Sequence, residues 1–179
     1  MFLTRVFISF FEFLLSALVS VLVVYVTYRV FVLTNTDFDG EEQIEKGNTA
    51  VAILIAAIMI SSSWIIQKGL DSVERLFRMY MTTPIQDVTS WWKLMLLAFT
   101  HLFMSFFLAV FTFSFSLRLF GKLMRRMHLG RELEKGNAAV GILLAGVIFV
   151  ISTYVSDGVS SLSKSLLPQP SIGRVQIMK

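Results

Sequence analysis

The chain carries EKGNTAVAILIAAI at positions 45–58 and EKGNAAVGILLAGV at positions 134–147. The two stretches lie 89 positions apart and share nine of their fourteen residues. In each, a charged pair, a glycine and an asparagine precede an apolar run that is rich in small residues. Such similarity at a fixed offset indicates an internal duplication, so we expect both copies to fold as the same supersecondary unit.

The composition predicts a membrane protein. Of the 179 residues, 55% are hydrophobic and only 16% are charged. A helix needs about 20 residues to cross a hydrocarbon core of about 30 Å. We therefore expect an all-α membrane protein with four transmembrane helices, at 6–33, 49–66, 94–120 and 138–155. The first run is too long for a cleaved signal peptide, so we expect the mature protein to retain it.

Each copy of the repeat is expected to cross the membrane twice. The two copies would then share one orientation, as parallel two-helix repeats related by a pseudo-two-fold axis along the membrane normal. The expected divisions are repeat 1 (1–66), an amphipathic connector at the membrane surface (67–93), repeat 2 (94–160) and a flexible tail (161–179). The connector is predicted from apolar residues that share one helical face: Leu70, Val73, Leu76, Phe77 and Tyr80.

The motif Glu-Lys-Gly-Asn-x-Ala opens an apolar helix twice in this small four-span chain. In this respect the chain resembles the domain-of-unknown-function 350 family. The similarity covers both helix pairs and is most specific at 45–58 and 134–147. The resemblance implies a multi-pass protein of the bacterial inner (cytoplasmic) membrane. It implies no reaction, because the family is named for lacking an assigned function.

The repeated helix-start motif is the first candidate site, and it comprises Glu45, Lys46, Gly47, Asn48, Glu134, Lys135, Gly136 and Asn137. An asparagine side chain can cap the free amides of a first helical turn, and glycine allows a sharp turn before it. The alternative is that the same amides bind an anion or a lipid phosphate. Ordinary capping is favoured, since the glutamate of each motif would oppose an anion.

Small residues recur at matching places in both copies: Ala52, Ala56, Gly141 and Ala145. Small residues four apart let helices approach closely in lipid, so we expect the second and fourth spans to pack through them. The alternative is that alanine is simply common in spanning helices.

Four ionisable residues fall inside the expected spans. Glu12 and His101 are related by the offset of 89, and so are Arg29 and Arg118. Intramembrane charges are costly and often line a path for ions or protons, but both Glu12 and His101 could instead make a structural hydrogen bond or reach interfacial water. The two arginines are expected at the hydrocarbon edge, with their guanidinium groups among the headgroups.

No catalytic, cofactor or metal site is expected. The chain has no cysteine, only two histidines, and none of the common phosphate-binding, zinc-protease or serine-hydrolase motifs. Its net charge of +4 gives no indication of nucleic-acid binding. Apart from the lipid bilayer, the expected partners are further copies of the chain and a protein bound by the loops.

The first functional hypothesis is therefore a non-enzymatic scaffold that oligomerises through its spans and recruits a partner through its loops. The alternative is a small ion or proton channel or transporter, with Glu12 and His101 near a path at the repeat interface; a membrane enzyme comes third. The scaffold is preferred because no series of polar residues is recognised at the helical spacing that a wet pore requires.

Overall fold

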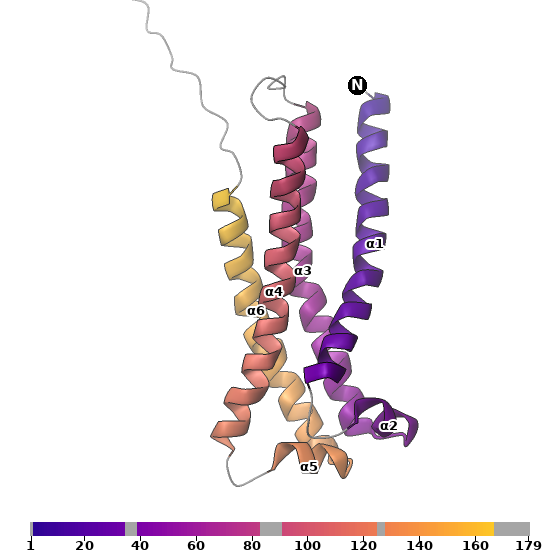
Figure 1. The fold of residues 1–179 in the computed structure, drawn as a ribbon, viewed down its shortest axis with the longest axis vertical. Coiled ribbons are helices and arrows are strands. Elements are labelled where there is room, and N and C mark those ends of the chain that lie inside the picture. The colour runs from indigo at the N-terminus through magenta and orange to yellow at the C-terminus, as the bar shows by residue number, and fades with distance from the viewer. Residues whose placement is uncertain (1, 35–38, 83–90, 125–127, 167–179) are drawn as a thin grey trace, which may run out of the picture.

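The computed structural model describes residues 2–34, 39–82, 91–124 and 128–166. Within these residues six helices follow one another in chain order (Figure 1). Four of them are long: α1 (Phe2–Thr34), α3 (Thr49–Thr82), α4 (Trp91–Leu123) and α6 (Ala138–Leu166). Two are short, α2 (Gly40–Glu45) and α5 (Leu129–Glu134), and both lie at the same end of the molecule.

The long helices have the length and composition of membrane spans. They contain 33, 34, 33 and 29 residues, and each includes an apolar window that can cross a membrane. Because about 20 helical residues suffice for a crossing, every long helix exceeds the requirement. The predicted all-α class with four spans is confirmed, and the protein is a multi-pass membrane protein.

Large apolar side chains cover the outside of the bundle. The clearest example is a row on α4 at intervals of four residues, which places its members on one helical face: Phe99, Phe103, Phe107, Phe111 and Phe115. In water such a continuous apolar surface would promote aggregation. Hydrocarbon chains solvate it instead, so this exposure agrees with the assignment of α4 as a span.

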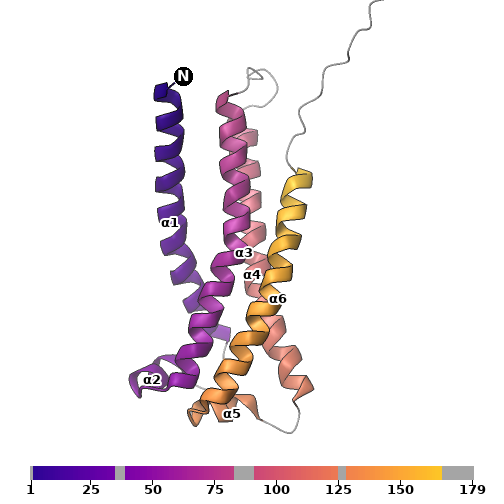
Figure 2. The same ribbon diagram turned by 180° about the vertical axis from the view of Figure 1, so that it is seen from behind.

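Helix α3 makes the most extensive contacts in the fold, above all with α6 and then with α4 and α1. Both views place α3 between α1 and α6 (Figures 1 and 2). The core near the helix-start motifs includes Leu54 and Ile58 from α3 and Leu144 and Ile148 from α6, each at most 2% exposed. The predicted contact between the second and fourth spans is therefore the main contact of the structure.

Gly141 lets the backbones of α3 and α6 touch. An ideal Cβ at Gly141 would lie 2.6 Å from the carbonyl oxygen of Ala50, which is fully buried. The expectation that Ala52 and Ala56 make this contact is wrong, since both are exposed in the chain, while Ala145 is half-buried. A turn of about 100° per residue places positions 50 and 52 on nearly opposite sides of the helix, and the duplication does not reveal which side faces inward.

The expected boundary at residue 66 is also wrong. Helix α3 continues without interruption to Thr82, and the apolar face assigned to a surface connector is buried inside the bundle. There Leu76 packs with Leu94 of α4, and the ring of Phe77 stacks on that of Phe11 from α1 at 4.4 Å between centroids. Neighbouring helices therefore bury this face. The rest of the connector (83–90) and most of the tail (167–179) lie outside the described residues.

The two copies have the same order of elements but different contacts. Helix α1 packs against α3 as α4 packs against α6. Helix α4 also packs extensively on α3, whereas α1 has no comparable contact with α6. The predicted two-fold arrangement of the copies thus stays a prediction, and within one chain the contacts around α3 and α6 are unequal.

Replacing Gly141 by alanine should lower the free energy of unfolding by about 1–3 kcal/mol, because the added methyl group overpacks the backbone of Ala50. Gly146→Ala is the matched control on the same helix, since the Cβ it would add has no atom of another helix within 4 Å. Thermal unfolding of both variants in detergent measures the difference. Equal melting temperatures would contradict the proposed backbone contact.

Candidate functional site

Each helix-start motif joins a short helix to a long one through the same turn. The φ angle is 73° at Gly47 and 81° at Gly136, in the left-handed region that glycine tolerates best. In the first copy the backbone N–H of Asn48 donates to the carbonyl oxygen of Gln43, and the backbone N–H of Gly47 donates to that of Ile44, both at 2.9 Å. This pair of bonds is a Schellman ending of α2, and α5 ends with the same pattern.

The side chain of Asn48 connects the two copies. Its Oδ1 accepts hydrogen bonds from the amides of Ala50 and Val51, at 3.1 and 3.2 Å, and so caps α3. Its Nδ2 donates to the carbonyl oxygens of Leu133 and Glu134 at the end of α5, at 2.8 and 3.1 Å. Because the asparagine itself occupies these amides, the geometry supports capping at this helix start over anion binding.

Asn48 Nδ2 also donates to Oε1 of Gln43, at 2.8 Å. Asn137 repeats this bond to the side chain five residues earlier, but not the bonds to the other copy. Its Nδ2 donates to Oε2 of Glu132 at 3.1 Å, within its own copy, and Lys135 Nζ lies 2.9 Å from Oε1 of the same carboxylate. The hydrogen bonds from Lys135 and then Asn137 hold the pKa of Glu132 below its usual range. These two hydrogen bonds therefore stabilise the fold fully above the pKa that Glu132 has in the unfolded chain. The stabilisation is lost as the pH falls through the lower pKa that Glu132 has in the folded protein.

Asn48→Ser should destabilise the fold by about 1–3 kcal/mol, since serine still caps α3 but leaves one buried and one partly buried carbonyl oxygen of α5 without their donor. Asn137→Ser is the repeat-equivalent control and loses one hydrogen bond at a half-buried position. Hydrogen exchange of the α5 amides reports the effect. Faster exchange in Asn48→Ser alone is expected, and equal exchange in both variants would show that Asn48 does not hold α5.

His101 lies on α4 and is fully buried. Neither Nδ1 nor Nε2 has a hydrogen-bond partner among the residues that the structure describes. An imidazole always carries at least one N–H, so leaving it unpaired costs on the order of 1–3 kcal/mol. The neighbouring helix is close at this level: an ideal Cβ on Gly69 of α3 would overlap the Ser105 hydroxyl and lie 3.0 Å from the His101 carbonyl oxygen.

His101 begins a series of buried polar residues on one face of α4, at intervals of four, seven and four: His101, Ser105, Thr112 and Ser116. Helix α6, which packs against α4, has a similar buried series: Ser152, Ser156 and Ser163. The expectation that no polar series occurs at helical spacing is therefore wrong. Single serine or threonine residues between long apolar stretches hardly lower the mean hydropathy of a helix. Only the structure shows that these residues are buried on the same helical face.

Several of these hydroxyls are satisfied within their own helices. Ser105 donates to the carbonyl oxygen of His101 at 2.8 Å, and Ser116 to that of Thr112 at 2.6 Å. Serine and threonine commonly bond back to the preceding turn in this way. Within the described part of the chain, buried hydroxyl oxygens without a partner belong to Ser61, Ser62 and Ser163. His101 differs from all of them because it can also change its charge.

Glu12, the repeat-equivalent of His101, is held in an ion pair. Arg78 Nη2 lies 2.8 Å from both carboxylate oxygens of Glu12, whose side chain is 13% exposed. One turn along α1, the Ser16 hydroxyl donates to Glu74 Oε1 at 3.0 Å. Glu74 and Arg78 were not predicted as site residues, because the sequence pattern placed them in a surface connector. Their spacing of four, which matches that of Glu12 and Ser16, was the available signal.

No group of three or more His, Cys, Asp or Glu side chains within the described segments could hold a metal ion.

The family model described as Domain of Unknown Function (DUF350) matches residues 2–159. The chain belongs to the DUF350 family. The match extends from α1 into α6 and confirms the resemblance that the repeated helix-start motif indicated. No curated protein and no solved structure matches this DUF350 chain.

Four further charged residues singled out in the DUF350 sequence lie on its surface. Arg29 on α1 and Arg118 on α4 are exposed near the ends that adjoin the helix-start motifs. Long side chains at such positions can place their charge among lipid headgroups, and this remains our prediction for both. Glu45 and Glu134 are exposed at the ends of α2 and α5.

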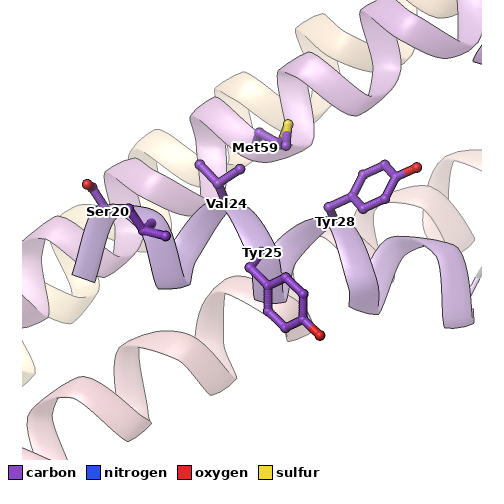
Figure 3. Close-up of a pocket in the computed structure, with 6 residues that line it drawn as sticks. Ser20, Val24, Tyr25, Tyr28 and Met59 are labelled. Atoms are coloured by element: carbon purple, nitrogen blue, oxygen red, sulfur yellow. The ribbon is translucent and has the colours of Figure 1, made fainter. Parts of the chain in front are cut away.

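A groove of about 510 Å³ lies between α1 and α3 of the DUF350 protein (Figure 3). Most of its lining comes from α1, and Met59 contributes from α3. The rings of Tyr25 and Tyr28 point to different sides of it. The groove is open and its walls are mainly carbon, as expected where lipid chains contact two diverging helices. The buried polar groups around His101 are therefore the stronger candidate site.

Proposed function

We propose that this DUF350 protein conducts protons across the membrane, with His101 as the proton-binding group inside the bundle. The observation that supports the proposal is the fully buried imidazole on α4, whose two nitrogens lack partners among the described residues. Ionisable groups inside a span are costly and commonly mark the path of an ion or proton. An imidazole suits this role because its neutral form can accept a proton and its protonated form can release one.

Buried hydroxyls provide a route from His101 towards the helix-start end of the bundle. The series on α4 continues to Ser116, fifteen residues further on, which corresponds to about 22 Å of helix. A hydroxyl both donates and accepts hydrogen bonds, so it can take part in a proton-conducting chain together with water. Ser152 and Ser156 on the adjacent α6 supply further buried hydroxyls.

The tight packing favours a proton over a hydrated metal ion. Helices α3 and α4 are in contact beside His101, where a Cβ on Gly69 would overlap Ser105. A metal ion needs space and several oxygen ligands along its whole path. A proton can instead pass through exchanging hydrogen bonds between side chains and water molecules, so it needs less space than a hydrated ion.

Proton flux into liposomes that contain the purified protein tests the proposal. His101→Ala should reduce the flux by about a hundredfold, as expected when a proton-transfer group is removed. His128→Ala is the matched control, since His128 is the other histidine of the chain and is exposed ahead of α5. Equal flux for wild type and His101→Ala would refute His101 as the conducting group.

A second candidate is the membrane scaffold that oligomerises through its spans and recruits a partner through its loops. The supporting observation is the unequal environment of two repeat-equivalent glycines. Gly69 on α3 is covered by Ser105 of α4, whereas Gly158 on α6 is exposed, and a Cβ built on it has no atom of another helix within 4 Å. A second subunit that packs against α6 would cover Gly158 in the way that α4 covers Gly69. The exposed Ala52 and Ala56 would also suit close helix contact.

Gly158→Leu should then lower the number of subunits in the detergent-solubilised complex, because the larger side chain would prevent close helix approach. Gly121→Leu on α4 is the control, since it too has open space around its Cβ position but lies on the other long helix of the repeat. Light scattering after size-exclusion chromatography measures the mass. A monomeric wild-type protein would rule out this oligomer.

A further inference from the structure

Two carboxylates lie at the contact between α1 and α3, and their partners differ. Glu12 is bound by the guanidinium of Arg78, with Nη2 at 2.8 Å from each carboxylate oxygen. Glu74 accepts a hydrogen bond from the hydroxyl of Ser16 at 3.0 Å. A guanidinium compensates the charge of a carboxylate directly, whereas a hydroxyl provides only a dipole. The two groups are therefore not equivalent as proton acceptors.

The surroundings of Glu74 contain more negative than positive charge. The charged groups that act on it are Glu12 from α1, together with Asp71 and Arg78 from its own helix. The one cation among them, Arg78, is bonded to Glu12. Adding a proton to Glu12 would break that ion pair. Adding a proton to Glu74 breaks no ion pair of this kind and removes a charge from a partly buried site.

Glu74 is also level with His101 along the bundle. Helices α3 and α4 run in opposite directions and touch where Gly69 meets Ser105. From that contact Glu74 is five residues further along α3 and His101 four residues back along α4, or about 7.5 and 6 Å in the same direction. The two titratable side chains therefore lie at similar depth, with Glu74 on the side of α3 that faces α1.

We propose that Glu74 is a second proton-binding site of this protein, at the contact between α1 and α3, and that Glu12 is not. This inference rests on the proposed proton conduction, for which Glu74 exchanges protons with the solution at the end of the bundle away from α2 and α5. The carboxylate takes up one proton to form the neutral acid, and the acid releases that proton to restore the carboxylate. Ser16 donates to the carboxylate and can turn to accept from the acid.

Infrared spectroscopy of the full-length protein in lipid nanodiscs tests the assignment, because a protonated carboxylic acid has its own carbonyl absorption. The other carboxyl groups of the chain add to this absorption as the pH is lowered, so each variant is compared with the wild type in difference spectra. Glu74→Gln should remove one component of the band, and Glu12→Gln should keep that component. Glutamine at position 74 can still accept the hydrogen bond from Ser16. Glutamine at position 12 keeps one acceptor oxygen for Arg78 and loses the bond that Oε2 of Glu12 accepts. A band that Glu74→Gln leaves intact, or one that both substitutions remove, would overturn the inference.

Proton flux measured on the same variants distinguishes this inference from the function on which it rests. Glu74→Gln should lower the flux by about a hundredfold, while Glu74→Asp, which keeps a carboxyl group, should recover most of it. If the wild type shows the Glu74 band but conducts no protons, the proposed function fails and the binding site stands. If His101→Ala stops the flux but Glu74→Gln leaves both flux and band unchanged, the function stands and Glu74 is excluded.

Discussion

Backbone contact between α3 and α6 is the constraint on which the rest of this structure depends. Lipid chains are as apolar as the helix surfaces, so helices in a bilayer gain little from the hydrophobic effect when they associate. Close approach and hydrogen bonds must hold them instead. Gly141 against Ala50 supplies the close approach, and Asn48 supplies hydrogen bonds to the end of α5 in the other copy. These features place both helix-start motifs at one end and let α1 and α4 pack around the pair.

The central position of α3 explains why the polar groups gather on it. At the end of the bundle away from α2 and α5, α3 lies between α1 and α4 and meets an ionisable residue from each. Glu12 of α1 binds Arg78 of α3, and the helical turn of α4 that contains His101 packs against α3 at Gly69. Glu12 and His101 are tolerated at this depth because protein largely surrounds them, whereas the side chain of Arg78 is 62% exposed. The same shielding makes His101 suitable for binding a proton.

The two halves of the chain carry the same helix-start motif, but their environments differ. Asn48 bonds both within its own copy and across to the other, while Asn137 bonds within its own. Gly69 is covered, whereas Gly158 is open. Glu12 is neutralised by a cation, whereas its counterpart His101 is buried without a partner among the described residues. Two copies with the same helices can thus divide their roles: one polar position stabilises a helix contact and the other remains available for chemistry.

The sequence by itself determined the number and approximate position of the spans, because hydropathy and length decide whether a helix can cross a bilayer. It also determined the turn at Gly47 and Gly136, since local backbone geometry demands glycine there. Only the tertiary structure decided which face of each helix is buried, that α3 continues to Thr82, and that Glu12 pairs with Arg78. In a helix that is apolar all round, periodicity does not identify the inward face, and contacts between residues 66 positions apart depend on how whole helices pack.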